Sequence, residues 1–159
     1  MASVVAELLE RRLDDGSSSR SLTTDDILVV CPYNAHVRAV EAALVERGIR
    51  RVRVGTVDRF QGREAPVVVA SLCAPPSQND EDEDSVASGG RGVAFVLDVR
   101  RLNVALSRAQ CLAVLVAAPD LADGAASSLD RMRELAVLSR LRELAVDTVV
   151  AEESVAGEP

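Results

Sequence analysis

Three short apolar runs, separated by longer mixed segments, constrain the fold of this chain more than any other feature of its sequence. They are ILVVC at 27–31, PVVVASLCA at 66–74 and CLAVLVA at 111–117. Their apolar and largely β-branched composition predicts buried strands. The alternating run RVRV at 51–54 predicts a fourth strand between the first two.

Segments with helical spacing of apolar residues alternate with these strands. We expect helices over 3–13, 34–47, 94–108 and 128–145, the second with Asn34 as its N-cap and Gly48 as its stop. Central strands that are apolar throughout are typical of a parallel sheet covered on both faces. The pattern therefore predicts an α/β fold with three layers.

The length of 159 residues fits one ordinary α/β domain. We assign residues 1–145 to this domain and 146–159 to a C-terminal tail. Residues 75–92 contain the unbroken acidic run Asp80 to Asp84 among prolines, serines and glycines, which is typical of a mobile loop. The polar segment 14–26 also indicates a loop.

All 18 basic residues are arginine, because the chain contains no lysine. A Walker A loop grips the β- and γ-phosphates of a nucleotide with a lysine, so this chain contains no such loop. The net charge is −7, yet 27–64 holds seven arginines and four acids, and 91–110 holds four arginines and one acid. These two segments are locally basic, which keeps nucleic acid among the expected partners.

Simple counts disfavour several other classes of protein. No apolar run reaches the roughly 18–20 residues of a membrane helix, and no secretion signal is recognisable, so we expect a cytoplasmic protein without a membrane partner. Cys31, Cys73 and Cys111 lie far apart and His36 is the single histidine, so we expect no structural zinc. The cysteines are interpreted as small buried hydrophobes.

Polar clusters directly follow two of the predicted strands. Pro32-Tyr33-Asn34 follows the first, and Gly55-Thr56-Val57-Asp58 follows the second. Ligands of open α/β sheets gather at the carboxyl ends of the strands. Both clusters are therefore candidate binding segments.

Three segments resemble motifs of one helicase family, in the family's order. ILVVCPYNAHVRAVEAAL (27–44) resembles motif IV, VGTVDRFQGREAPVVVASL (54–72) motif V, and RRLNVALSRAQCLAVLVAA (100–118) motif VI of superfamily 1 helicases of the Upf-like and Dna-two-like branch. The resemblance covers nearly the whole chain. It implies a RecA-like domain of the P-loop NTPase type, namely the second, C-terminal motor domain.

The stretch RGVAFVLDVRRLNVALSRA is most similar to bacterial members in which the helicase is fused to a RecB-like nuclease. The chain also departs from the family pattern. His36 stands where glutamine is usual, Pro66 stands where an acid is frequent, and motifs I, Ia, II and III are absent. The resemblance therefore implies half of a motor, which is not expected to hydrolyse ATP alone.

The resemblance assigns a catalytic role to Arg108, as the arginine finger that stabilises charge on the transferred phosphoryl group. The alternative is a solvated surface arginine before a strand. Gln61, Gly62, Arg63 and Glu64 are implied to bind the nucleotide, Glu64 through its ribose; a turn with exposed charges is the alternative. Arg101 is expected to face the same cleft as Arg108.

Pro32, Tyr33 and Thr56 are implied to contact nucleic acid. Thr56 could bind a phosphate or cap its own backbone. Tyr33 could stack on a base or pack with a satisfied hydroxyl. His36 is expected to be a surface or capping residue, and Asp58 to order its loop.

The predicted function is the C-terminal motor half of an ATP-dependent DNA or RNA helicase. ATP and Mg²⁺ would be held mainly by a first RecA-like motor domain, in cis or in trans. Single-stranded nucleic acid is the expected substrate and a fused nuclease a possible neighbour. The alternative is a non-catalytic remnant that binds nucleic acid or a partner motor domain.

Overall fold

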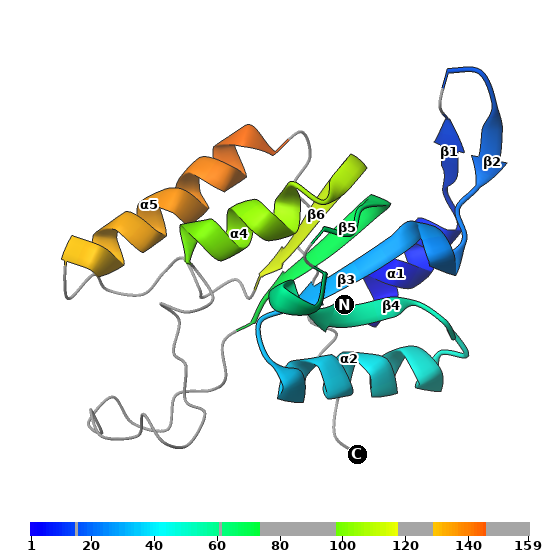
Figure 1. The fold of residues 1–159 in the computed structure, drawn as a ribbon, viewed down its shortest axis with the longest axis horizontal. Coiled ribbons are helices and arrows are strands. Elements are labelled where there is room, and N and C mark those ends of the chain that lie inside the picture. The colour runs from blue at the N-terminus through cyan, green and yellow to red at the C-terminus, as the bar shows by residue number, and fades with distance from the viewer. Residues whose placement is uncertain (15, 61, 74–97, 118–128, 146–159) are drawn as a thin grey trace, which may run out of the picture. The chain divides into compact units, whose positions relative to one another are not determined.

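The computed structural model describes residues 1–14, 16–60, 62–73, 98–117 and 129–145 (Figure 1). The chain divides into two compact units, Met1–Ala118 and Pro119–Pro159. Gln61, the expected loop 75–92 and the expected tail 146–159 lie outside the described residues. The assignment of 1–145 to one motor domain stays a prediction.

A four-stranded parallel sheet forms the centre of the first unit. Its strands are β3 (Ile27–Cys31), β4 (Arg53–Thr56), β5 (Ala65–Leu72) and β6 (Ala109–Ala117), in the order β4-β3-β5-β6. This confirms the predicted parallel sheet. The strand expected at 51–54 begins two residues later, because Arg51 has a left-handed φ of 70° that a strand does not accept.

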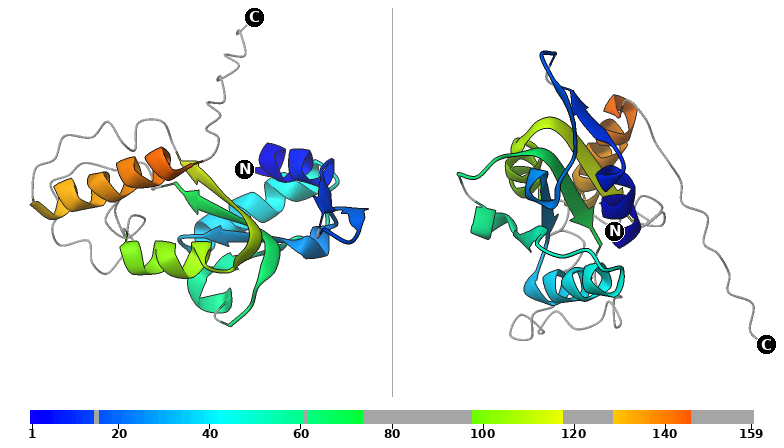
Figure 2. Two further views of the ribbon diagram at one scale, coloured as in Figure 1. Left: turned by 90° about the horizontal axis from the view of Figure 1, so that it is seen from above. Right: turned by 90° about the vertical axis from the view of Figure 1, so that its right-hand side faces the viewer.

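Helices cover both faces of the sheet, as predicted. Helices α1 (Ala2–Leu9) and α2 (Asn34–Glu46) lie on one face, and the 3₁₀ turn η2 (Val57–Phe60) and helix α4 (Val99–Leu106) lie on the other (Figure 2). Successive strand side chains point to opposite faces. In β3, Val29 therefore packs in the first layer and Leu28 in the second.

Helix α2 begins and ends close to its predicted bounds. Tyr33, in extended conformation, is its N-cap in place of Asn34, and no side chain caps the helix. Gly48, with φ 72°, ends it as predicted. The amide of Ile49 donates to the carbonyl of Leu44 at 2.9 Å, which turns the chain inward toward the core.

A short hairpin that the sequence did not predict occupies the end of the helix expected at 3–13, which stops at Leu9, and the start of the polar segment 14–26. Strands β1 (Arg12–Asp14) and β2 (Ser19–Ser21) pair antiparallel and extend away from the sheet (Figure 1). The Arg12 guanidinium donates to Ser19 Oγ at 3.0 Å and to the Ser19 carbonyl at 2.6 Å. These side-chain hydrogen bonds stabilise the hairpin, and its strands have no alternation of apolar and polar residues. The sequence therefore contained no pattern that would predict strands here.

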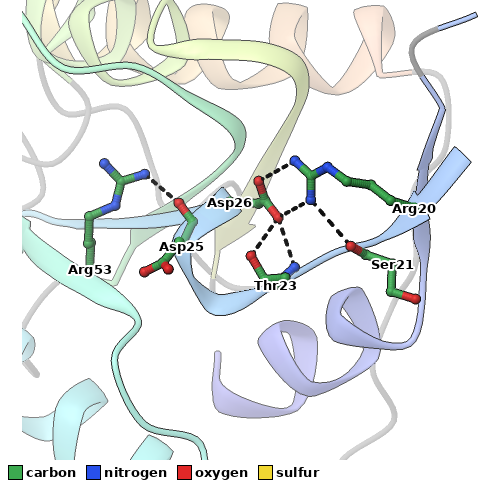
Figure 3. A network of polar contacts seen from close by, with 6 residues as sticks. All are labelled: Arg20, Ser21, Thr23, Asp25, Asp26 and Arg53. Carbon is green, nitrogen blue, oxygen red and sulfur yellow. Dashed lines mark hydrogen bonds and ion pairs between the residues drawn. The ribbon is translucent and has the colours of Figure 1, made fainter. Parts of the chain in front are cut away.

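A polar network ties the hairpin to the start of the sheet (Figure 3). Arg20 donates to both carboxylate oxygens of Asp26, at 2.6 and 2.7 Å. The amide and hydroxyl of Thr23 donate to the same carboxylate, at 2.8 and 2.7 Å. Nearby, Arg53 donates to the Asp25 carbonyl at 2.8 Å. The network fixes the short 3₁₀ turn η1 (Thr24–Asp26) directly before β3.

The second unit contains helix α5 (Leu129–Leu144), which falls within the helix predicted at 128–145. Leu138 is buried and Leu135 and Leu141 are half-buried, as their spacing of three residues predicts. Within the described ranges, no helix is long and apolar enough to cross a membrane.

The interpretation of all three cysteines as buried hydrophobes is wrong for one of them. Cys31 is buried in the central strand β3, and burial raises the pKa of its thiol to about 12. Cys73 is half-buried at the end of β5. Cys111 is exposed, because β6 is the outer strand of the sheet and is covered less than its neighbour.

Candidate functional site

Arg108 lies in the two-residue turn between α4 and β6, at the amino edge of the sheet. Its carbonyl accepts a hydrogen bond from the Ala65 amide at 3.1 Å, which joins the turn to the first residue of β5. Its side-chain Nε donates to the Val104 carbonyl, one helical turn earlier, at 3.2 Å. The backbone and the base of the guanidinium are therefore both fixed.

The turn Gly62-Arg63-Glu64 lies directly beside Arg108, because it leads into Ala65. Gly62 has φ 77°, and a Cβ there would meet nothing within 4 Å, so this glycine is required by conformation rather than by space. The side chains of Arg63 and Glu64 are exposed. The predicted nucleotide-binding turn and the predicted arginine finger thus lie next to each other.

A β-bulge strengthens this junction. Ala65 pairs with Ala109, but Val67 pairs with Leu112, so β6 carries one extra residue at this point. In the bulged segment, Gln110 Nε2 donates to a Glu64 carboxylate oxygen at 3.4 Å. The bulge therefore places a side chain of the motif VI segment against the motif V turn.

An open pocket with a volume of about 380 Å³ lies between η2 and α4. Three arginines and two aspartates contribute to its lining, a formal charge of +1. Two valines also contribute. The lining residues are Val57, Asp58, Asp98, Arg100, Arg101, Val104 and Arg108. The expectation that Arg101 and Arg108 face one cleft agrees with this geometry.

The two aspartates of the pocket have separate structural roles. Asp98 is the N-cap of α4, and its carboxylate accepts from the amides of Arg100 and Arg101 at 2.8 and 3.2 Å. Asp58, on η2, lies 3.7 Å from the Arg101 guanidinium. The Asp58 side chain is 81% exposed, so this ion pair adds little to stability. It does link η2 to α4 across the pocket.

The predicted nucleic-acid residues lie at the opposite, carboxyl edge of the sheet. Pro32 and Tyr33 follow β3, and Thr56 ends β4 beside Cys31. The Tyr33 hydroxyl donates to the Cys73 carbonyl at 3.0 Å, and burial raises its pKa. This bond satisfies the hydroxyl, so any contact of Tyr33 with a base would use the face of its ring.

Arg101 connects the two edges. A second, small cavity of about 30 Å³ lies at the carboxyl edge, lined by Pro32, Leu72 and Arg101 among others. Arg101 therefore contributes to both cavities. Arg108 follows it by seven residues, in the turn after α4. The structure brings Arg108, Gly62, Arg63 and Glu64 toward the amino edge, and Pro32, Tyr33 and Thr56 toward the carboxyl edge, while Arg101 lines both cavities.

At the carboxyl edge, Ser71 was not identified from the sequence, and His36 differs from its expected surface position. Ser71, in β5, is 4% exposed, and its hydroxyl lies 3.4 Å from His36 Nε2. His36 is half-buried rather than a surface residue, and burial lowers its pKa. Its Nδ1 is buried without a hydrogen-bond partner in the described part of the chain. The only sequence signal was a serine within an otherwise apolar strand.

At Gly55, in β4, the structure leaves no room for a side chain. A Cβ there would lie 2.8 Å from Arg59 Cδ and 2.8 Å from Phe60 Cε2. The Phe60 ring is 4% exposed and packs under η2 with Leu28 and Val68. Gly55 therefore lets η2 lie close on the strand, which sets one wall of the open pocket.

A parallel sheet with helices on both faces is typical of a RecA-like α/β domain of the P-loop NTPase type, and a basic pocket lies in its second helical layer, between η2 and α4. The model of a family described as "AAA domain" matches residues 1–120. The chain belongs to this family. Its relatives are helicases, and it is a helicase-related domain of superfamily 1.

Three relatives illustrate the range of the family. The chain is 40% identical over 93 residues to the "DNA polymerase alpha-associated DNA helicase A" of Schizosaccharomyces pombe, covering 58% of this chain and 12% of that protein. It is 33% identical over 113 residues to the mouse "DNA replication ATP-dependent helicase/nuclease DNA2", covering 71% of this chain and 9% of that protein. It is 28% identical over 103 residues to the mouse "RNA helicase Mov10l1", covering 65% of this chain and 8% of that protein. The chain thus spans about a tenth of these relatives.

Proposed function

We propose that this chain is the second, C-terminal motor domain of an ATP-dependent superfamily 1 helicase. In this proposal Arg108 is the arginine finger for a nucleotide held between this domain and a first motor domain. One observation carries the proposal: Arg108 lines an open basic pocket while its backbone is joined to the Gly62-Arg63-Glu64 turn.

The geometry of Arg108 suits this role. Its Nε is held by the Val104 carbonyl, and among the described residues its two terminal amino groups have no protein partner. A fixed guanidinium with open donors stabilises negative charge that develops on phosphoryl oxygens, an effect of about 10³–10⁵ in rate for arginine fingers. Removal of Arg108 would therefore affect hydrolysis more than binding.

The neighbouring residues fit other parts of a nucleotide. The exposed Glu64 carboxylate would accept hydrogen bonds from ribose hydroxyls, and Arg63 and Arg101 would meet phosphate oxygens. Gly62 allows a close approach of the backbone, with Gln61 as the residue before it. ATP would supply the phosphoryl group and Mg²⁺ would neutralise part of its charge. Both would be held mainly by the first motor domain, since this chain has no lysine for a Walker A loop.

The carboxyl edge is the proposed contact with single-stranded nucleic acid. Thr56 offers a hydroxyl for a backbone phosphate, and Pro32 and the ring of Tyr33 offer an apolar surface for a base. Such contacts make binding dependent on salt and largely independent of sequence. Some relatives are named as DNA helicases and one as an RNA helicase, so both DNA and RNA should be tested as substrates. A fused nuclease is proposed from the resemblance of the motif VI segment alone.

A non-catalytic module is the second candidate, and the absence of lysine favours it. A chain of this kind would bind nucleic acid or a partner motor domain without taking part in hydrolysis. The two candidates differ in one respect: only the first requires Arg108 for turnover.

Reconstitution tests the proposal. We expect the purified chain alone to show no ATP turnover, since it lacks the loop that grips the phosphates. Addition of the Walker-motif motor domain of the same protein, in cis or in trans, is expected to give turnover that single-stranded nucleic acid stimulates. Steady-state ATPase assays measure both. Turnover by the chain alone, or no gain from this chain over the first domain alone, contradicts the proposal.

A further inference from the structure

An arginine-rich surface lies between α2 and β4, at the amino edge of the sheet. It precedes the outer strand β4, whereas Arg108 precedes the outer strand β6 on the other side of the sheet. Arg47, Arg50 and Arg51 are all exposed, and no acidic residue interrupts 47–53. Within the described ranges, none of the three side chains has a hydrogen-bond or ion-pair partner. Their guanidinium groups are therefore available to a ligand, although the chain as a whole carries a charge of −7.

The backbone presents these three side chains outward in a defined way. Gly48, with φ 72°, ends α2, and the hydrogen bond from the Ile49 amide to the Leu44 carbonyl turns Ile49 toward the core. The residues on either side of Ile49 then face solvent. The dipole of α2 accounts for a cation at Arg47 but not for Arg50 and Arg51, which lie beyond the last turn.

Arg51 adds a second observation. It has φ 70°, and it is the only residue other than glycine with a positive φ in the described part of the chain. Such a conformation is strained for a residue with a Cβ, and it tends to occur where function requires it. Glycine would avoid this strain, but it would remove the guanidinium.

We infer that the surface of Arg47, Arg50 and Arg51 binds the phosphate backbone of duplex nucleic acid. Exposed guanidinium groups bind phosphates independently of sequence. Single-strand sites combine basic residues with aromatic rings on which bases stack. No aromatic residue lies in 34–59, so this surface fits a ligand whose bases are already paired and whose phosphates face outward.

The inference extends the proposed function, because it adds a contact for the duplex that a helicase would meet ahead of the single strand. It does not depend on hydrolysis. The length of β4 separates this surface from Thr56, which lies at the other end of that strand. The loop that carries the three arginines lies at the same end of the sheet as the β1–β2 hairpin (Figure 1). The duplex and the single strand would therefore occupy different parts of the domain.

Salt-dependent binding of the purified chain to a short blunt-ended DNA duplex tests the inference. The probes are a labelled duplex and a labelled single strand of equal length, measured by fluorescence anisotropy between about 50 and 200 mM salt. For a variant with Arg47→Gln, Arg50→Gln and Arg51→Gln, we expect the slope of log K against log salt on the duplex to fall by about 2–3, close to 0.9 per lost phosphate contact. The slope on the single strand should not change.

A variant with Arg11→Gln, Arg38→Gln and Arg142→Gln is the matched control, since it makes the same change in charge at other exposed positions. It should keep the wild-type duplex slope, and circular dichroism should show that both variants are folded.

Three results overturn the inference. They are an unchanged slope for the variant of Arg47, Arg50 and Arg51, an equal loss for this variant and the control, and no duplex binding by the wild-type chain. An equal loss on the single strand indicates a single-strand site instead. Displacement of the duplex by polyglutamate at equal charge concentration indicates an acidic protein partner. Each of these results leaves the ATPase test of the proposed function unaffected.

Discussion

The arginines of this chain differ by what holds each guanidinium. Arg20 is bound at both ends of its fork by Asp26, and Arg53 donates to a backbone carbonyl. Arg108 is held only at Nε, by the Val104 carbonyl. The motif pattern selected Arg108 from the sequence. It could not predict the contact with Val104, because that bond depends on a side-chain rotamer at the end of α4.

Asp26 predicts a specific dependence of stability on pH. The hydrogen bonds from Arg20, with those from Thr23, hold the pKa of this carboxyl well below its ordinary value, against the opposing effect of burial. A depressed folded-state pKa means that the stabilisation is complete above the unfolded value of about 4 and is lost as pH falls below it. Urea unfolding from pH 7 down to the acid limit should show this loss.

Asp26→Asn removes the charge that Arg20 and Thr23 bind. We expect it to lower the free energy of unfolding at pH 7 by about 1.5–3 kcal/mol, the range for hydrogen bonds to a charged group. Its stability should then vary less with pH below about 5 than that of the wild type. Asp25→Asn is the matched control, since Asp25 is exposed and only its backbone carbonyl is used. Equal pH profiles for Asp26→Asn and the wild type would contradict the assignment.

At the level of elements, the spacing of apolar residues in the sequence predicted most of the buried strands and the helices that cover them. The strands β3, β5 and β6, the helices α2 and α5 and the two covered faces follow from it. The hairpin β1–β2 was missed, because the Arg12–Ser19 bonds hold it. The start of β4 was placed too early because RVRV alternates regardless of the backbone of Arg51. His36 and Ser71 meet only through the parallel arrangement of β3 and β5, which a linear pattern does not contain.

The close contact between β4 and η2 predicts that a methyl group added at Gly55 lowers the stability of the domain. Gly55→Ala would place a Cβ 2.8 Å from the buried Phe60 ring, which has no free space to move into. We expect a loss of about 1–3 kcal/mol in the free energy of unfolding, the usual cost of overpacking. Urea denaturation measures it.

Two comparisons separate overpacking from a loss of glycine flexibility. Gly48→Ala should cost about 1 kcal/mol through its positive φ alone, since a Cβ there meets nothing within 4 Å. Phe60→Leu in the background of Gly55→Ala should recover part of the loss, so that the two changes are not additive. Strict additivity would show that the methyl group and the ring do not clash.

At the level of the whole molecule, two sets of candidate residues lie at opposite edges of one sheet. The eight residues of β5 separate these edges by about 23 Å. The pocket that Arg108 lines is open, and the chain contributes three arginines and two carboxylates to it but no lysine. In the proposed function, such a pocket is half of a nucleotide site. The motifs in the sequence indicate this division, which stays a prediction, while the sheet register determines how close Glu64 and Arg108 come.

The most direct test of the account is the single-turnover rate of ATP hydrolysis by the reconstituted two-domain motor with Arg108→Ala. We predict a fall of about 10³–10⁵ in this rate with little change in the affinity for ATP, because the arginine acts on charge that develops during the reaction. Arg38→Ala changes an exposed arginine outside the pocket and should leave the rate unchanged. A wild-type rate for Arg108→Ala would contradict the account.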